Sequence, residues 1–237
     1  MTRKVSKITP INQNLKNHVL NSKNTEIIIM IKPKFIVFEG IDGAGKTTQI
    51  KLLCQALEKK GISLKTTVEP TDMPSGRAIR EALSGRIKKT AEEMALMFTA
   101  DRVLHNTDQD NGINAMLENG FSVISDRYYY SSLAYQGAAL GYDLVAKLNL
   151  DREDIRTPDL CIFLDLTPEK SLERIGGRGE AKEIYENIEY LTKTRAMFFD
   201  VFEKLRARGE KIAVIDASGS VNEVAERVLA AALEIYT

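Results

Sequence analysis

The chain has 237 residues, 43% of them hydrophobic, which suits one large α/β domain or two small ones and excludes wholesale disorder. No apolar run approaches the roughly 18 residues of a membrane-spanning helix, and two cysteines, Cys54 and Cys161, cannot form a disulfide framework. The net charge is zero but uneven, because residues 1–34 hold seven Lys/Arg and one acid, so the other 203 residues are acidic. We therefore expect a cytoplasmic protein that binds neither membrane nor nucleic acid.

Residues 1–33 differ from the rest and are predicted to form a disordered N-terminal extension. They are rich in Asn and Lys, contain Pro10 and lack a periodic apolar face. Met30 offers a natural start just before the first predicted strand, which favours an untranslated or dispensable upstream stretch. Two alternatives stay open, a transit peptide, although Arg3 is the one arginine there, and a functional arm.

Residues 34–237 alternate between strand-like and helix-like segments, which predicts one α/β domain. The pattern indicates a five-stranded parallel sheet with helices on both faces. Strands are expected over residues 35–38, 64–68, 121–124, 160–166 and 212–215. Helices are expected over 46–60, from a Ser75 cap to Leu83, from a Thr90–Glu93 capping box through Leu104, up to Asn119, and from a Ser220–Glu223 capping box.

The strongest functional signal follows the first predicted strand and precedes the first predicted helix. The stretch from Gly40 to Thr47 fits the G-x-x-x-x-G-K-[ST] phosphate loop in full. Glycines let successive backbone N–H groups surround a polyphosphate, and the helix N-terminus adds partial positive charge. We predict that Lys46 reaches the β- and γ-phosphates of a nucleoside triphosphate and that the Thr47 hydroxyl binds Mg²⁺. The expected ATP-binding residues are Gly40, Ile41, Asp42, Gly43, Ala44, Gly45, Lys46, Thr47 and Thr48.

A phosphate loop alone does not distinguish a kinase from a GTPase or a motor ATPase. The sequence has no Asn-Lys-x-Asp to read guanine, and its third predicted strand runs into Asp126-Arg127 instead of the Asp-Glu pair typical of motors. An arginine beside the phosphate loop suits the binding of a second anion. Asp126 is a second candidate for binding Mg²⁺.

Several sequence blocks, in order, resemble the thymidylate kinase family of P-loop nucleoside-monophosphate kinases. The similarity runs from Phe35 to about Ile235. Its most specific block is Asp-Arg-Tyr-Tyr-Tyr-Ser-Ser-Leu-Ala-Tyr-Gln-Gly at residues 126–137. The other blocks are the phosphate loop, Glu69-Pro70 with Gly76 and Ile79-Arg80, Phe98-Thr-Ala-Asp-Arg102, and Pro158-Asp159 leading into Asp165-Leu-Thr-Pro168.

This resemblance implies that ATP phosphorylates dTMP to dTDP, on the path to dTTP, in a homodimer with a small mobile lid. Asp42 would hold the 3′-hydroxyl or a metal-bound water, Phe98 would stack on thymine, and Arg102 and Arg127 would grip the monophosphate. Arg80 would reach a thymine carbonyl, and Tyr135 would pack against the sugar. The implied dTMP residues are Asp42, Glu69, Arg80, Phe98, Arg102, Arg127, Ser132, Tyr135 and Gln136, with Ser131 beside them. Tyr128 and Tyr129 are expected to be packing residues.

The predicted lid, about residues 174–183, carries the bases that the phosphate loop lacks beyond Lys46. Arg174, Arg178 and Lys182 lie there among three glycines, and Arg178 is expected to reach the transferred phosphoryl group. The expected catalytic residues are therefore Lys46, Arg178, Asp42 and Arg127. Residues 216–218, after the fifth predicted strand, would lie beside the adenine of ATP. Two alternatives stay open: another monophosphate acceptor such as dUMP, and a nucleotide-dependent binding switch.

Overall fold

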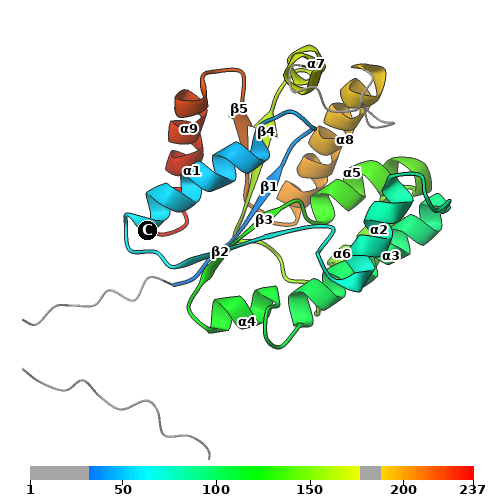
Figure 1. The fold of residues 1–237 in the computed structure, drawn as a ribbon, viewed down its shortest axis with the longest axis horizontal. Coiled ribbons are helices and arrows are strands. Elements are labelled where there is room, and N and C mark those ends of the chain that lie inside the picture. Colours follow the sequence, from blue (N-terminus) through cyan, green and yellow to red (C-terminus); the bar gives the residue numbers. More distant parts are fainter. Residues whose placement is uncertain (1–31, 177–187) are drawn as a thin grey trace, which may run out of the picture. The chain divides into compact units, whose positions relative to one another are not determined.

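The computed structural model describes residues 32–176 and 188–237, which form an α/β domain (Figure 1). Most of the predicted extension, and the predicted lid from residue 177 onward, lie outside these residues. In chain order the elements are β1 (Phe35–Glu39), α1 (Lys46–Glu58), β2 (Leu64–Val68), α2 (Pro74–Leu83), α3 (Ala91–Thr107), α4 (Ile113–Glu118), β3 (Ser122–Asp126), α5 (Tyr129–Leu140), α6 (Tyr142–Leu150), β4 (Leu160–Asp165), α7 (Pro168–Gly176), α8 (Ile188–Ala207), β5 (Ile212–Asp216) and α9 (Val221–Leu233).

The five strands form one parallel sheet in the order β2-β3-β1-β4-β5. In the register of the central strands, Phe38 of β1 lies opposite Asp126 of β3 and Ile162 of β4. The carboxyl ends of β1 and β3 therefore meet, which brings the phosphate loop after β1 beside Arg127 after β3. This is the α/β architecture that the alternating sequence predicted.

Alternation along each strand sends successive side chains to opposite faces of the sheet, and both faces are covered by helices. Ile36 and Phe38 pack with α1 and α9 in one core, while Phe35 and Val37 pack with α5 and α8 in the other. All four side chains are fully buried. Figure 1 shows α1 and α9 together on one side of the sheet and α5 and α8 on the other. Tyr128 and Tyr129 lie in the second core, so the packing role expected for them is confirmed.

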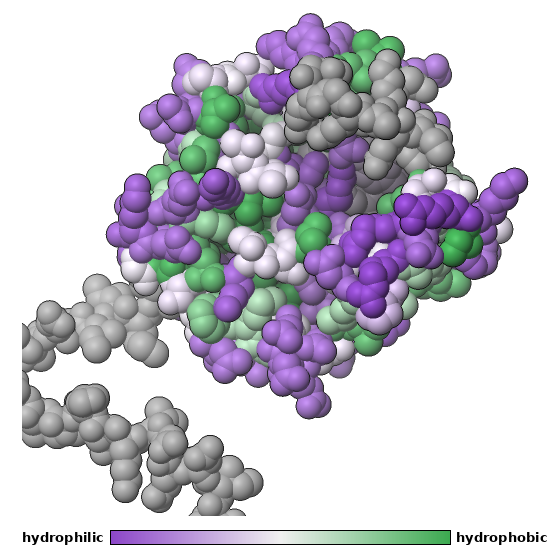
Figure 2. Space-filling model, viewed as in Figure 1, coloured by the Kyte–Doolittle hydropathy of each residue, from purple (hydrophilic) through white to green (hydrophobic). Residues whose placement is uncertain are grey.

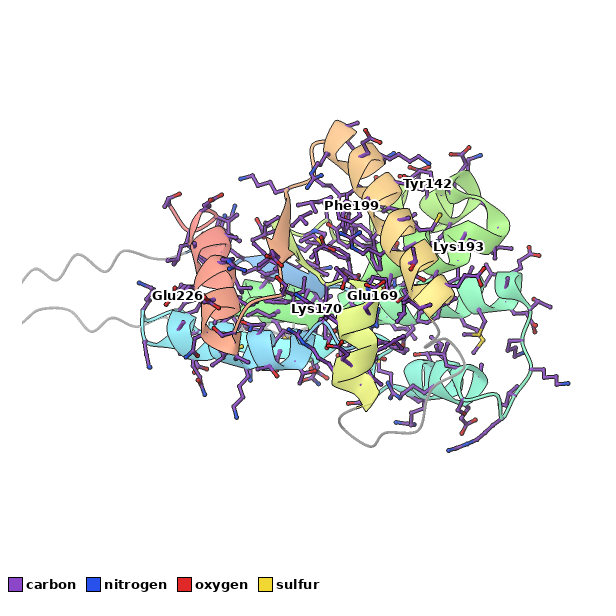
Figure 3. All side chains as sticks on the ribbon, turned by 90° about the horizontal axis from the view of Figure 1, so that it is seen from above. Tyr142, Glu169, Lys170, Lys193, Phe199 and Glu226 are labelled. Atoms are coloured by element: carbon purple, nitrogen blue, oxygen red, sulfur yellow. The ribbon has the colours of Figure 1, made fainter. Side chains whose placement is uncertain are left out.

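Helix α7 lies between the α1–α9 side and the α8 side of the domain. In the view from above, Glu169 and Lys170 on α7 stand between Glu226 of α9 and Lys193 of α8 (Figure 3). The Ser171 hydroxyl of α7 donates to the backbone oxygen of Asp42. The helix that leads into the predicted lid thus rests directly on the phosphate loop.

The structure confirms both predicted capping boxes but corrects the start of α2. Thr90 with Glu93, and Ser220 with Glu223, make both reciprocal hydrogen bonds. Ser75 does not cap α2, because the N-cap residue is Met73 and Pro74 occupies the first turn, where its missing N–H costs nothing. The Ser75 hydroxyl instead donates to Asp101 Oδ1 at 2.6 Å.

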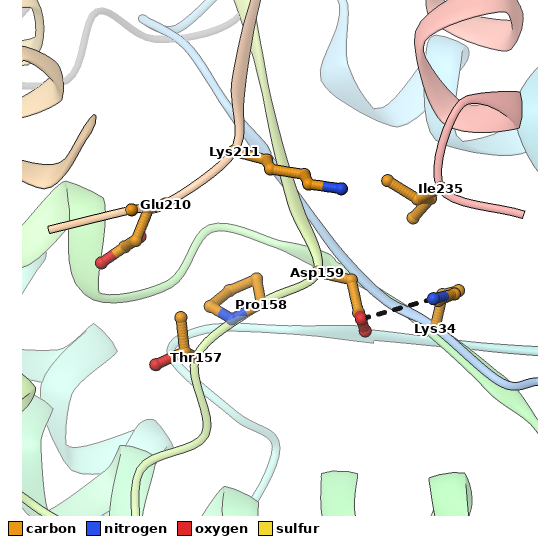
Figure 4. Close-up of a pocket in the computed structure, with 8 residues that line it drawn as sticks. Lys34, Thr157, Pro158, Asp159, Glu210, Lys211 and Ile235 are labelled. Atoms are coloured by element: carbon orange, nitrogen blue, oxygen red, sulfur yellow. Dashed lines mark ion pairs between the residues drawn. The ribbon is translucent and has the colours of Figure 1, made fainter. Parts of the chain in front are cut away.

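A polar pocket lies at the amino-terminal ends of the strands, the opposite end of the sheet from the phosphate loop. It is lined by Lys34 before β1, Asp159 before β4, Lys211 before β5 and Ile235 near the C-terminus. Lys34 Nζ lies 3.8 Å from Asp159 Oδ1, and Figure 4 shows this pair facing the pocket. Because the phosphate loop contributes nothing here, this pocket is separate from the candidate active site.

Candidate active site

The phosphate loop folds tightly against β4 and α7, and its glycines are required by that contact. Gly40 and Gly43 have φ values of 150° and 80°, and a Cβ atom would stand 2.9 Å from the Leu164 oxygen and 2.8 Å from the Ser171 oxygen. A side chain at either position would displace backbone. Gly45, with φ of 96°, is the N-cap residue of α1. The helix N-terminus therefore opens directly onto the loop.

Lys46 is a buried cation that lies across this loop. Its Nζ donates to the backbone oxygens of Gly40 at 3.1 Å and Ile41 at 3.5 Å, and it lies 3.8 Å from Asp42 Oδ1. Burial lowers the pKa of Lys46, and the nearby Arg127 lowers it further. A polyphosphate placed in the loop would relieve this repulsion, so the loop is built to receive an anion.

The residues predicted to bind Mg²⁺ fit that ion. Thr47 is exposed on the first turn of α1, and Asp126 Oδ1 is buried without a hydrogen-bond partner within residues 32–176 and 188–237. A buried carboxylate oxygen without a partner is a suitable ligand for a hard cation. The described part of the chain contains no group of three or more His, Cys, Asp or Glu side chains able to hold a metal by themselves. Mg²⁺ usually keeps several waters and binds through one or two protein side chains together with substrate phosphates, which suits this pair of residues.

Arg127 joins the phosphate loop to the segment that follows β3. It has a left-handed backbone with φ of 70°, and its backbone N–H donates to the Phe38 oxygen at 2.9 Å. Its Nη2 donates to Asp42 Oδ1, and its Nη1 donates to Ser131 Oγ at 3.1 Å. Burial works to lower the pKa of Arg127, but Tyr135 and the nearby carboxylates raise it above its ordinary value. A strained backbone thus holds a permanent cation beside the loop.

Arg102 on α3 is also buried, but its charge is already paired. It is 1% exposed, and its Nε donates to Glu69 Oε2 at 2.8 Å. Nη1 donates to Asn149 Oδ1, and Nη2 donates to Ser132 Oγ at 3.2 Å and lies 2.7 Å from Glu69. Four of the five N–H groups of a guanidinium are therefore engaged. Glu69 also contacts His105 Nδ1 at 2.9 Å, so both of its oxygens are occupied by protein.

Arg80 on α2 is more accessible than Arg102 and has weaker partners. Its Nη1 donates to the Pro70 oxygen at 2.7 Å, and its Nη2 lies 2.9 Å from Asp72 Oδ1. The side chains of Arg80 and Asp72 are 40% and 93% exposed, so a bound anion can replace Asp72 at small cost.

The remaining predicted dTMP residues surround the same region. Phe98 lies one helical turn before Arg102 on α3 and is partly exposed. The Tyr135 ring makes an edge contact with Phe198 and lies under Arg127, whose guanidinium carbon is 5.8 Å from the ring centroid. Gln136 follows it on α5 and is partly exposed. Near its centre this face of the molecule is hollowed, and hydrophilic residues gather there (Figure 2).

Comparison with known proteins identifies the group to which this site belongs. The thymidylate kinase family model matches residues 38–228, from the end of β1 into α9. The chain belongs to the thymidylate kinase family. A probable thymidylate kinase of Thermococcus gammatolerans is 42% identical over 200 residues, covering 80% of this chain and 91% of that protein. The thymidylate kinase of Leptospira interrogans is 36% identical over 199 residues, covering 84% and 93%.

The family assignment confirms the resemblance drawn from the sequence and covers both sides of the site. The phosphate loop and Arg127 lie within the matched range, as do Arg80 and Arg102. Of the predicted lid bases, Arg174 donates from Nη2 to the Ala217 oxygen at 2.9 Å. Arg178 and Lys182 lie outside the described residues, and their roles stay predictions.

Sequence reasoning did not single out Glu39, the last residue of β1. It is fully buried beside the phosphate loop, and burial raises its pKa to about 7, although Arg127, Ser131, Tyr128 and Lys46 act to lower it. The sequence did contain a signal for Glu39, because an acidic residue at the end of an otherwise apolar, buried strand needs hydrogen-bond donors.

Proposed function

We propose that this chain transfers the γ-phosphoryl group of ATP to dTMP, giving dTDP and ADP on the path to dTTP for DNA synthesis. Family membership supports the reaction. The observation that carries it in the structure is the contact between Arg127 and Asp42, because it holds a cation for a second anion at the edge of the phosphate loop. Cys54 and Cys161 are unpaired, which suits a reducing cytoplasm as the location. Among the described residues, no helix is long and apolar enough to cross a membrane.

Phosphoryl transfer requires the protein to position charged groups and to exclude water from the site. The phosphate of dTMP, with a second pKa of about 6, is ionised near neutral pH and needs no general base. Lys46 neutralises charge on the donor side and Arg127 on the acceptor side, which lets two anions approach in line. Bound Mg²⁺, held through Thr47 and Asp126, would neutralise further phosphate charge.

The charges around Arg80, Arg102 and Arg127 indicate which part of dTMP each of these arginines would bind. Arg127 faces the donor loop, and Asp72, the carboxylate that pairs with Arg80, is exposed, so these two arginines suit the phosphate of dTMP. Arg102 is neutralised by Glu69 and keeps one N–H, which suits a single uncharged carbonyl of the base. This division exchanges the roles that the sequence suggested for Arg80 and Arg102. Phe98, Ser132, Tyr135 and Gln136 complete the proposed base and sugar pocket.

Acceptor-dependent release of ADP tests the proposed function. Purified protein is assayed with ATP and, in separate reactions, dTMP, dUMP and other nucleoside monophosphates. We expect dTMP to give the highest kcat/KM. A higher kcat/KM for dUMP would make dTMP the wrong acceptor, and slow hydrolysis that no acceptor stimulates would make the protein a nucleotide-dependent switch.

Arg178 is proposed as the second cation on the transferred phosphoryl group. Arg174 donates from Nη2 to the Ala217 oxygen in the loop after β5, and its Nη1 lies beside Gly45 of the phosphate loop, so Arg174 is the alternative candidate for this role. We expect Arg178→Ala to lower kcat by about 10²-fold with little change in either KM, because a group that arrives on closure acts mainly on the transition state. Steady-state kinetics measures this effect, and Arg174→Ala is the comparison. A near-normal kcat for Arg178→Ala with a strong loss for Arg174→Ala would exchange the two roles.

A homodimer is proposed through α3, the long helix from Ala91. Leu96 and Leu104 on this helix are 50% and 49% exposed, and Leu144 on α6, which packs against α3, is 44% exposed. These exposed leucines on adjacent helices support the choice of this surface for the proposed interface. We expect Leu104→Glu to convert a dimer to a monomer in light scattering, while Val221→Glu on α9 leaves it dimeric. A monomeric wild-type protein at micromolar concentration would contradict this proposal.

A further inference from the structure

Glu39 ends β1 directly before the phosphate loop, yet its carboxylate faces the segment that follows the neighbouring strand β3. Its Oε1 accepts hydrogen bonds from the backbone N–H groups of Tyr128 at 2.9 Å and Ser131 at 3.1 Å. Its Oε2 accepts from the Ser131 hydroxyl at 2.7 Å. The side chain is fully buried. Three donors from one short segment therefore converge on one buried carboxylate.

These contacts take the place of an N-cap side chain for α5. The first turn of a helix presents backbone N–H groups that have no partner within the helix. Tyr128, the N-cap residue of α5, provides no side-chain hydrogen bond. The Glu39 carboxylate fills this role from another strand, and a negative charge at this position is also favoured by the helix dipole. The start of α5 is thereby tied to the end of β1.

The same carboxylate reaches Arg127 through one hydroxyl group. Ser131 Oγ donates to Glu39 and accepts from Arg127 Nη1, so a continuous chain runs from Glu39 through Ser131 to the guanidinium. The Arg127 backbone is held on both sides, because its N–H donates to Phe38 and its oxygen accepts from Ser125 Oγ at 2.8 Å. With the backbone fixed, the direction of the guanidinium depends on Ser131, Asp42 and the Tyr135 ring.

We propose that Glu39 is a positioning residue of the acceptor site, which caps α5 and, through Ser131, orients Arg127 toward the phosphate of the acceptor nucleotide. Glu39 is fully buried beside the loop, so it affects the acceptor by positioning Arg127 and not by touching the substrate. The proposal rests on the proposed function, since it concerns how Arg127 binds the phosphate of dTMP.

Glu39→Gln tests this role with little change in shape. The amide oxygen can still accept from the two backbone N–H groups, but the amide nitrogen donates where the carboxylate accepted from Ser131 Oγ. The Ser131 hydroxyl then loses its hydrogen bond to a carboxylate and must accept a second donor, so its bond from Arg127 is weakened. We expect the KM for dTMP to rise about tenfold, as for a lost hydrogen bond to a charged group, and the KM for ATP to stay unchanged.

Thymidine separates positioning of Arg127 from a general disturbance of the pocket. It carries the base and sugar of dTMP but lacks the phosphate that Arg127 would bind. We expect its inhibition constant against dTMP to be the same for wild type and Glu39→Gln. If Glu39→Gln raised the inhibition constant of thymidine and the KM for dTMP by the same factor, Glu39 would have a purely structural role and the proposal would be overturned. An unchanged KM for dTMP would also overturn it.

Ser131→Ala removes the link itself and leaves Glu39 with its two backbone donors. We expect it to raise the KM for dTMP by a factor similar to that of Glu39→Gln, and we expect the double variant to be no worse than either single one, because both break one chain of contacts. If the increases in the KM for dTMP caused by the two single substitutions multiply in the double variant, the proposal is overturned. If Glu39→Gln does not fold, Ser131→Ala decides alone. A wild-type chain whose ADP release dTMP does not stimulate would refute the proposed function first.

Discussion

Arg127→Ala should lower kcat/KM for dTMP by about 10²- to 10³-fold while the KM for ATP stays nearly unchanged. Truncating one partner of a buried, charge-assisted contact costs about 2–5 kcal/mol. The expected contact of this kind is the one between Arg127 and the acceptor phosphate, because Asp42, Ser131 and the Tyr135 ring hold the partly buried guanidinium in place. Loss of Arg127 would remove the cation proposed for the acceptor phosphate, whereas Lys46, proposed to bind ATP, is retained. Steady-state kinetics with each substrate varied in turn measures both effects.

Arg152→Ala is the matched control for this experiment. Arg152 also pairs with a carboxylate, Asp154, at 2.6 Å, but the pair is exposed and lies after α6, so its loss should leave the kinetics unchanged. If Arg127→Ala raised the KM for ATP and the KM for dTMP by the same factor, the arginine would support the fold of the loop and would not bind the acceptor.

Much of the fold could be predicted because local signals agree with it. The apolar run at residues 35–38 belongs to a strand buried on both faces, and the glycines of the phosphate loop occupy positions where a Cβ would meet backbone. The Thr90–Glu93 and Ser220–Glu223 pairs form the capping boxes that their spacing predicts. Each of these signals depends on residues close together in the sequence.

The errors and omissions concern contacts between distant segments. Ser75 has the chemistry of an N-cap, but Asp101 on α3 takes its hydroxyl, and Pro74 begins the helix. The sequence placed Arg102 near the substrate, but could not show that Glu69, 33 positions earlier, already neutralises it. Glu39 was missed for the same reason, because its donors lie 89 and 92 positions away.

Lys46→Met should give the largest loss, lowering kcat by about 10³-fold. Methionine has similar length but removes the charge that we propose faces the transferred phosphate, and loss of one such preorganised donor costs about 10²–10³ in rate. The bonds from Nζ to the Gly40 and Ile41 oxygens are lost as well, which loosens the loop. Lys51→Met is the matched control, since Lys51 lies exposed on the same helix. A kcat within tenfold of wild type would contradict this role for Lys46.

The pH dependence provides a second test of Lys46, and its sign follows from burial. Burial and Arg127 lower the pKa of this ammonium from its ordinary value of 10.5, so the free protein loses the charge at lower pH than an exposed lysine does. Because kcat/KM reports the free enzyme, the value for ATP should fall on an alkaline limb below pH 10.5. Bound ATP brings phosphate charge that raises the pKa again, so the corresponding limb in kcat should lie at higher pH. Both limbs should disappear in Lys46→Met, and their persistence there would assign them to another group.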